Sequence, residues 1–439
     1  MPDVVPFSQR RPEGVESSRS AWSPLTRVFF RFASVYLLLS GCYWIFVFAD
    51  KSTALLGKPY NALWRPFAQW IAMHVMHATV AVEPNFVRDT RYLYALLICF
   101  VVFSAVAAAV WSWLDRQRTE YVALNDWLRV FLRYVLAYLM LHYGLDKIFL
   151  IQFPAPGLAR LTEKFGDYSP SSLMWAFIGS SAPYTAFGGL AEVLGGLLLL
   201  SRRPTTLGAL IAFAVMFNVT VMDFSYDVGV KLLCLNILLM ATYLVLPDAR
   251  RLLNFFILNR ATSPAQLEAV VLNFPASRIA LLVKICVVFV LIVPLTVREW
   301  KSYREIGAGA PRPPLYGLYE VEDFSLNGTV HPPLLTDTVR WRYVILETPN
   351  VIAVKHMDDS LSQYRMGYDA AQHTIKLDAA GDVAEKSVLS VSETGAGGMT
   401  LDGTFAGNAI HTTLRRVDRS SFTLVNRGFH WISESSFVR

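Results

Sequence analysis

Seven apolar stretches, each close to the length of a membrane-spanning helix, constrain this chain more than any other feature. A helix needs roughly 20 predominantly apolar residues to cross the hydrocarbon core of a bilayer. Hydrophobic residues make up 54% of the chain and charged residues only 17%, which argues against a soluble protein. We therefore expect an α-helical integral membrane domain of about seven spans within residues 27–300. The predicted spans are 28–48, 92–113, 128–146, 183–201, 206–222, 229–247 and 279–298.

The positions of arginine predict how this domain is oriented, because positive residues are retained on the cytoplasmic side of membrane proteins. Arginines gather before the first span and in alternate loops, as Arg10, Arg11, Arg19, Arg27, Arg116, Arg118, Arg202, Arg203, Arg250, Arg251, Arg260 and Arg278. This pattern predicts a cytoplasmic tail at residues 1–26 and, with an odd number of spans, a C-terminus outside the cytoplasm. We expect a multi-pass protein of the inner (plasma) membrane whose C-terminal domain is periplasmic or extracellular.

The composition changes at residues 301–314, a Gly/Pro-rich linker that includes the sequence GAGAPRPP. The following residues, 315–439, contain short alternating segments separated by turn sequences, a pattern typical of antiparallel strands. Eight or nine consecutive strands, with residues 422–432 as the last, favour an all-β, up-and-down barrel over a sandwich. We expect an extracytoplasmic β-barrel domain. Its interior is either filled by side chains or hollow enough for one hydrophobic ligand, since barrels of this size do both.

A lipocalin-like arrangement is one form that such a barrel takes. Gly317 and Tyr319 fall in the first predicted strand, and Arg427 falls in the last. In this arrangement, the arginine closes the base of the barrel against the aromatic ring of the first strand.

Ionisable residues between Tyr143 and Lys231 mark the candidate functional site. Such groups are costly in hydrocarbon and are retained for pairing or for chemistry. Glu192 lies about nine residues into the fourth predicted span, and Glu192 and Lys231 are the catalytic candidates; pairing of Lys231 with Glu192 or with Asp146 is expected. The alternative is that these charges only fix the register of the helices and anchor their ends. The ligand-binding candidates are Tyr143, Asp146, Lys147, Gln152, Trp175, Asp223, Tyr226 and Asp227.

The motifs GLDK, QFPAP and YDVGVK, together with the helix around Glu192, resemble the DoxX-like family of bacterial membrane proteins. The resemblance covers about residues 128–250, and long members with a C-terminal β-domain resemble the whole chain. Relatives include the small subunit of a thiosulfate:quinone oxidoreductase. The resemblance implies an inner-membrane protein that binds a quinone or another hydrophobic envelope molecule in a redox-linked role. In such a role Glu192 exchanges protons, and Lys231 or Tyr226 donates a hydrogen bond.

A second function, from a different class, is also consistent with the sequence. The chain is then a non-enzymatic structural or assembly factor of the envelope whose β-domain binds a partner protein. Most members of the DoxX-like family have no assigned reaction, so whether this chain is an enzyme stays open. Membrane lipids are expected neighbours in both cases.

Several other classes of function are not expected. The formal charge of +6 is spread over the flanks of the spans, so nucleic-acid binding is not predicted. His74 and His77 are two metal ligands at most, too few for a zinc site, and we expect no metal. Nucleotide-binding and hydrolase motifs are missing. Disulfides are not expected in the β-domain, because all four cysteines fall in predicted spans, as Cys42, Cys99, Cys234 and Cys286.

Overall fold

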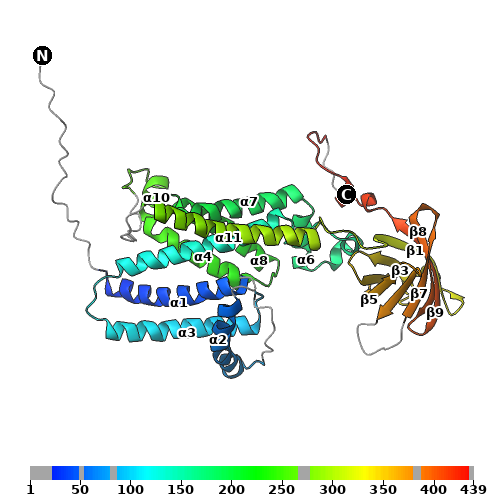
Figure 1. Cartoon of the computed structure of the whole chain (residues 1–439), viewed down its shortest axis with the longest axis horizontal. Coiled ribbons are helices and arrows are strands. Elements are labelled where there is room, and N and C mark those ends of the chain that lie inside the picture. The colour runs from blue at the N-terminus through cyan, green and yellow to red at the C-terminus, as the bar shows by residue number, and fades with distance from the viewer. Residues whose placement is uncertain (1–21, 49–53, 80–86, 265–276, 379–386, 435–439) are drawn as a thin grey trace, which may run out of the picture. The chain divides into compact units, whose positions relative to one another are not determined.

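The computed structural model of the chain describes residues 22–48, 54–79, 87–264, 277–378 and 387–434. Helices fill the N-terminal part and strands the C-terminal part (Figure 1). Among the described residues, five helical stretches are long and apolar enough to cross a membrane. They are α1 (Pro24–Phe48), α3 (Arg91–Leu114), α7 (Ala182–Leu199), α8 (Thr205–Ser225) and the stretch Lys231–Phe256, which comprises α9 (Lys231–Val245), η2 (Leu246–Asp248) and α10 (Ala249–Phe256).

The third and seventh predicted spans also form helices, α4 (Val122–Ile148) and α11 (Ser277–Glu305). Neither belongs to the five stretches, and seven spans are therefore not confirmed. Polar residues interrupt the apolar sequence of α4, and charged residues close α11. Most of the predicted cytoplasmic tail, and the side chain of Cys286, lie outside the described residues.

The chain divides into two compact units. Unit 1 comprises residues 1–137, 199–210 and 230–276, and unit 2 comprises residues 138–198, 211–229 and 277–439. In unit 1, α1 and α2 (Ala54–His74) both pack against α3 (Figure 1). Arg31 of α1 is buried there and donates to the hydroxyl of Tyr121 at 2.6 Å and to the carbonyl of Asp115 at 2.8 Å. These bonds satisfy a guanidinium inside an apolar unit.

Two neighbouring residues of unit 1 cap the starts of two helices. The Thr90 side chain accepts a hydrogen bond from the Leu93 amide at the start of α3. Both carboxylate oxygens of Asp89 accept from the start of α9, one from the Lys231 amide at 2.8 Å and one from the Leu232 amide at 3.0 Å. A carboxylate stabilises the N-terminus of a helix because it satisfies free amides and complements the helix dipole.

The segment after α4 contains three short helices, α5 (Leu158–Leu161), η1 (Phe165–Asp167) and α6 (Pro170–Gly179). Ser169 accepts a hydrogen bond from the Ser172 amide, and Pro170 occupies the first turn of α6. A hydroxyl at the cap and a proline at the first helical position are a strong helix start.

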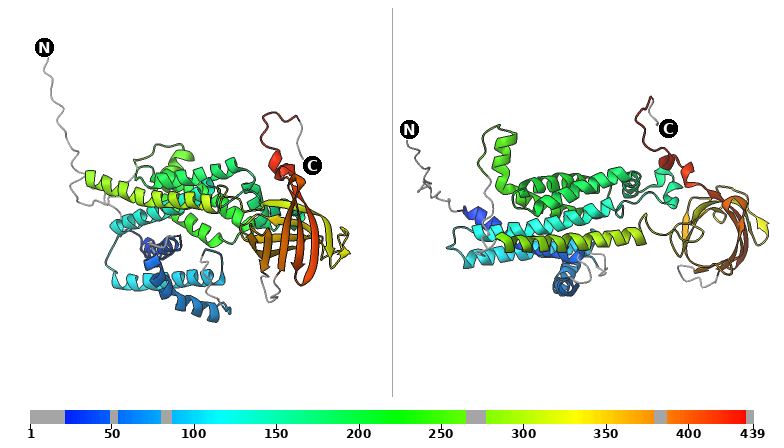
Figure 2. Two further views of the ribbon diagram at one scale, coloured as in Figure 1. Left: turned by 45° about the vertical axis from the view of Figure 1, so that its right-hand side comes forward. Right: turned by 45° about the horizontal axis from the view of Figure 1, so that its top comes forward.

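The C-terminal residues form a closed antiparallel barrel, which is seen end-on in the right panel of Figure 2. The described sheet has nine strands in the order β2-β1-β3-β4-β5-β6-β7-β8-β9, and pairing of β1 with β9 closes it. Because β2 pairs only with β1, the other eight strands make the wall. The strands are β1 (Gly317–Leu326), β2 (Thr329–Val330), β3 (Trp341–Leu346), β4 (Val351–His356), β5 (Leu361–Asp369), β6 (Thr374–Asp378), β7 (Ser387–Thr394), β8 (Gly398–Phe405) and β9 (Asn408–Val417).

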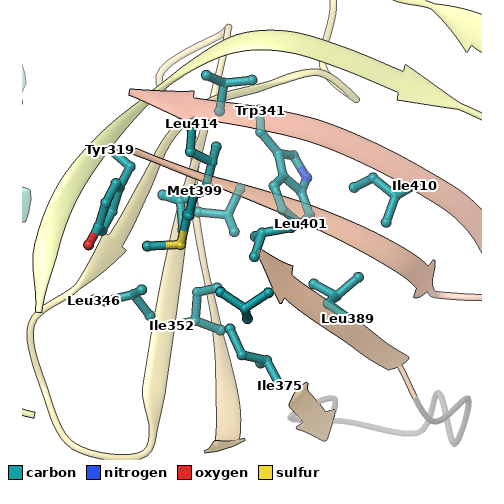
Figure 3. Packing of buried hydrophobic residues seen from close by; sticks show 14 of the residues in the cluster. Tyr319, Trp341, Leu346, Ile352, Ile375, Leu389, Met399, Leu401, Ile410 and Leu414 are labelled. Carbon is teal, nitrogen blue, oxygen red and sulfur yellow. The ribbon is translucent and has the colours of Figure 1, made fainter. Parts of the chain in front are cut away.

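Side chains fill the interior of this barrel (Figure 3). The described core cluster includes residues from every wall strand, and its largest fully buried members are Trp341 and Phe324. No member of the cluster is more than 6% exposed, whereas a water-sized cavity would expose its lining. Of the two interiors expected from the sequence, the structure has the packed one.

The predicted last strand is wrong. Residues 419–426 form η4 (Arg419–Ser421) and the short helix α12 (Thr423–Asn426), and Arg427 follows α12 outside the barrel. The lipocalin-like closure by Arg427 is therefore wrong as well. Arg416 is the residue of the last strand that lies opposite Tyr319 in the β1–β9 pairing. The linker is also shifted, because α11 continues to Glu305 and β1 begins at Gly317.

Residues 156–164 dock on the outer wall of the barrel. The Leu158 amide donates to both carboxylate oxygens of Glu347, at 2.9 and 3.0 Å, and Lys355 donates to the Thr162 carbonyl at 2.6 Å. A β-carbon at Gly157 would lie 2.7 Å from the same carboxylate, so a larger residue there would displace the Glu347 side chain. A salt bridge from Lys164 and the nearby Lys355 keep the pKa of Asp359 below its usual value. The barrel is thus attached by more than its linker.

Buried and exposed side chains alternate along β7. Truncating two adjacent side chains of this strand should therefore change the stability of the barrel by very different amounts. Leu389 is fully buried in the core, whereas Val388 is 40% exposed on the outer face. Leu389→Ala should destabilise the barrel by about 2–5 kcal/mol, because it leaves a cavity. Val388→Ala should cost less than about 1 kcal/mol. Proteolysis of the β-domain in purified full-length protein, measured across a urea series, distinguishes the two variants. Equal urea midpoints for their cleavage would contradict the packed interior.

Candidate functional site

Unit 2 contains nine of the ten residues predicted for the site, all except Lys231. Four occupy the end of α4 and the middle of α7, and the others lie in the segment 152–175, at the end of α8 and just after it. Lys231 opens α9 in unit 1, where Asp89 accepts its backbone amide. The predicted residues are therefore not one cluster, and the contacts of each decide what it can do.

Two glycines bring α4 and α7 unusually close. A β-carbon at Gly189 would lie 2.5 Å from the Gly144 carbonyl oxygen, and one at Gly144 would lie 2.8 Å from the Gly189 carbonyl oxygen. No larger residue fits at either position without moving a helix. Small residues allow such close packing between membrane helices. Gly189, three residues before Glu192, thus has a packing role.

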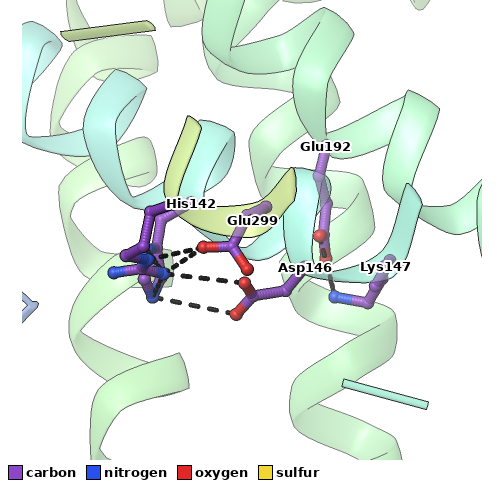
Figure 4. Close-up of polar contacts among 6 residues, drawn as sticks. His142, Asp146, Lys147, Glu192 and Glu299 are labelled. Atoms are coloured by element: carbon purple, nitrogen blue, oxygen red, sulfur yellow. Dashed lines mark hydrogen bonds and ion pairs between the residues drawn. The ribbon is translucent and has the colours of Figure 1, made fainter. Parts of the chain in front are cut away.

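This close approach places Lys147 of α4 beside Glu192 of α7 (Figure 4). The Lys147 ammonium donates to the two carboxylate oxygens of Glu192 at 2.8 and 2.7 Å. The side chains are 11% and 2% exposed, respectively. The same ammonium lies 5.7 Å from the ring centre of Tyr143 and 5.9 Å from that of Phe153, within the range of cation–π attraction. Glu192 is therefore paired with Lys147 in place of the predicted Lys231.

A second polar cluster joins the end of α4 to the end of α11 (Figure 4). One terminal nitrogen of Arg298 lies 2.8 Å from Nδ1 of His142 and 3.6 Å from a carboxylate oxygen of Asp146. Nε of Arg298 donates to Glu299 at 2.6 Å. His142 and Asp146 are one turn apart on α4, with Nε2 of His142 3.8 Å from the carboxylate. One guanidinium thus connects an imidazole and two carboxylates.

The two clusters differ in their access to solvent or ligands. Glu192 is almost fully enclosed, and its single cation contacts both of its oxygens. In the second cluster, the side chain of Asp146 is 17% exposed and that of Arg298 is 30% exposed. Guanidinium groups carry five N–H donors, so Arg298 retains donors for another acceptor. The Lys147–Glu192 pair is suited to holding helices, and the Arg298 cluster is suited to exchanging protons or binding a polar group.

Gln152 and Trp175 hold the segment after α4. The indole nitrogen of Trp175 donates to the backbone carbonyl of Gln152 at 2.9 Å, and the Trp175 ring contacts Phe153 at 5.0 Å. The side-chain oxygen of Gln152 is buried and accepts no hydrogen bond from the described residues. Gln152 thus positions Trp175 through its backbone, and its side-chain carbonyl still has acceptor capacity.

The three remaining candidates lie at the end of α8 and just after it. Asp223 is 3% exposed, whereas Tyr226 is 38% exposed. Asp227 has a φ of 51°, a left-handed conformation that ends the helix and that aspartate tolerates better than most residues. Tyr226 and Asp227 thus follow α8, outside the Lys147–Glu192 pair.

Sequence reasoning missed Arg298 and Glu299. Arg298 is the last residue of the seventh predicted span and Glu299 follows it, a position where charged side chains are commonly exposed. Glu299 is nevertheless 2% exposed. The available signal was the pair of opposite charges next to each other at the edge of an apolar stretch, since a buried carboxylate there requires a cation.

The Lys147–Glu192 pair predicts strongly non-additive effects of mutation. Glu192→Gln or Lys147→Met alone should destabilise the helical part by about 3–5 kcal/mol, because each leaves a buried charge unpaired. The double variant should recover much of this loss. Unfolding in mixed detergent measures the four proteins. The exposed pair Arg160–Glu163 is the matched control and should contribute no more than about 1 kcal/mol. If the losses of stability at positions 147 and 192 were additive, the two side chains would not stabilise the helical part as an ion pair.

Comparison with known proteins identifies a relative without an assigned activity. No family model matches the chain, and no solved structure matches it. A segment of 110 residues is 30% identical to the Bacillus subtilis (strain 168) protein described as "Uncharacterized protein YwoB", covering 23% of this chain and 71% of that protein. The chain therefore belongs to the same family as YwoB.

Proposed function

We propose that this chain is a DoxX-like inner-membrane protein that binds a quinone or another hydrophobic envelope molecule in a redox-linked role. The observation that carries the proposal is the cluster of His142, Asp146, Arg298 and Glu299. It offers hydrogen-bond donors and proton acceptors at the ends of two long helices, next to apolar segments. Residues of this kind fit a ligand with a polar head and an apolar body.

Membrane insertion of α4 and α11 completes the proposal. A helix of 27 residues, such as α4, is about 40 Å long and exceeds the hydrocarbon core of a bilayer. The charges near its end do not prevent insertion, because Lys147 pairs with Glu192 and Asp146 lies beside Arg298. With these two helices, the protein has seven spans, and the β-barrel lies on the periplasmic or extracellular side.

The residues of the Arg298 cluster have complementary roles towards such a ligand. Arg298 donates a hydrogen bond to a carbonyl oxygen of the head group, and His142 and Asp146 give or take protons at that oxygen. A quinone supplies two-electron redox chemistry coupled to protons when it is bound. Tyr138 stacks on His142 with ring centres 6.2 Å apart and limits how the imidazole can turn. The Lys147–Glu192 pair fixes α4 and keeps Asp146 in place.

A structural or assembly function is the alternative, and two observations favour it. The barrel interior is packed, so the β-domain acts through its outer surface. After the barrel, Phe429, Trp431 and Ile432 are 78%, 91% and 80% exposed, which suits contact with another protein. In this function the barrel binds a partner protein of the envelope, and stoichiometric copurification of one partner with no bound small molecule would favour it.

Ligand binding predicts a bound molecule that depends on Asp146. Protein extracted gently from native membranes should retain a quinone or another apolar molecule, identified by mass spectrometry. Asp146→Asn should lower its occupancy about tenfold, because hydrogen bonds to charged groups contribute roughly 1.5–3 kcal/mol. Asp167→Asn, at an exposed position of η1, is the control and should retain full occupancy. Equal occupancy in both variants, or no bound molecule in the wild type, would argue against the proposal.

The proposed topology predicts the location of the C-terminus. A reporter enzyme that is active only outside the cytoplasm, fused after Arg439, should be active in cells. The same reporter fused in the loop at Arg202 and Arg203, on the opposite side, should be inactive. High activity of a cytoplasm-dependent reporter at Arg439 would reverse the assigned orientation or change the number of spans.

A further inference from the structure

A cavity of about 570 Å³ opens at the place where the chain enters and leaves the barrel. Its lining includes Tyr316 and Leu318 before and within β1, and residues 416–420 at the end of β9. Leu158 of α5 and Val425 of α12 close other sides. The cavity lies outside the packed core and is distinct from both polar clusters of the helical part.

Three arginines line this cavity, Arg312, Arg416 and Arg419. They come from three separate places: the linker, the end of β9 and the turn that follows. Arg416 donates to the Tyr316 carbonyl at 3.3 Å and Arg419 to the Pro156 carbonyl at 3.2 Å, while Arg312 lies 4.8 Å from the ring centre of Tyr316. Each arginine is thus positioned by one weak contact and keeps other donors.

These arginines are not neutralised by carboxylates in the part of the chain that the structure describes. None of the three takes part in an ion pair within 4.0 Å there, in contrast to the neighbouring Arg415, which pairs with Glu322 at 2.9 Å. The cavity contains one carboxylate, Asp418, which accepts hydrogen bonds from the Ser420 amide at 2.9 Å and hydroxyl at 2.6 Å. The three arginines outnumber the single carboxylate, whose oxygens already accept hydrogen bonds from Ser420. The cavity therefore carries a net positive charge.

Four aliphatic side chains also line the cavity. Leu158, Leu318, Val417 and Val425 share the cavity with the arginines. A ligand that satisfies both parts carries an anionic group with several acceptor oxygens and an attached apolar portion. Arginine binds phosphate through paired N–H donors, and clustered arginines are typical of such recognition.

We propose that this cavity is a binding site for a phosphate-bearing group, supplied either by an anionic phospholipid headgroup or by a free phosphate compound. This site is independent of the function proposed for the helical part. Two of its arginines lie at the closure of the barrel, so occupancy fixes the linker to the segment after β9.

The test compares arginine-to-glutamine variants inside the cavity with one outside it. Full-length protein in detergent is titrated with dihexanoyl-phosphatidylglycerol and, separately, with inorganic phosphate, by calorimetry. Arg416→Gln/Arg419→Gln should weaken binding of the tighter probe by about tenfold or more, because two charge-assisted contacts are lost. Arg415→Gln, at the next position but outside the cavity, should bind as the wild type does. Should the double variant fail to fold by circular dichroism, Arg312→Gln in the linker replaces it.

The two probes distinguish the sources of phosphate. Tighter binding of the lipid by about tenfold, reduced by Val425→Ser, identifies a headgroup with its apolar portion. Similar affinities for both probes, lost in the cavity variants, identify a free phosphate compound. An absence of saturable binding to either probe, or equal weakening by Arg415→Gln, overturns the proposal.

Discussion

The contact between α4 and α7 at Lys147 and Glu192 is the constraint on which the polar architecture depends. Burying a carboxylate and an ammonium is costly unless they meet at short distance, and they meet only because glycine occupies positions 144 and 189. Successive residues on a helix point about 100° apart, so fixing Lys147 towards α7 turns Asp146 towards another neighbour. That neighbour is α11, which supplies Arg298. One ion pair therefore orients the second cluster without belonging to it.

Much of the fold could be predicted from local patterns, because those patterns report on single elements. Alternation predicted the barrel strands, and Ser169 followed by Pro170 is a local signal of the same kind for the start of α6. The partner of Glu192 could not be predicted in the same way. Lys147 and Lys231 are both lysines near the ends of apolar helices. Only the packing of Gly144 against Gly189 decides which of them pairs with Glu192. Arg298 was missed because its role depends on which helix lies beside α4.

The false last strand has a different physical reason. Residues 422–432 have the composition of a strand, but a strand also needs an edge with free backbone groups. Pairing of β1 with β9 over Leu318–Leu326 and Ile410–Val417 leaves no such edge in the wall. The segment therefore turns into η4 and α12 instead. Local propensity favours a conformation, whereas closure of the sheet decides whether a partner exists for it.

The contacts of residues 156–164 with the barrel wall have a consequence for how the chain can vary. They are spaced along one side, from Glu347 after β3, through Lys355 in β4, to Asp359 beyond it. A single linker would allow the barrel to rotate, whereas contacts at several heights along its wall resist that rotation. The residues between α11 and β1 that do not line the cavity are then under less constraint during evolution. Gly157 stays under more constraint, because a larger residue there would displace the Glu347 carboxylate.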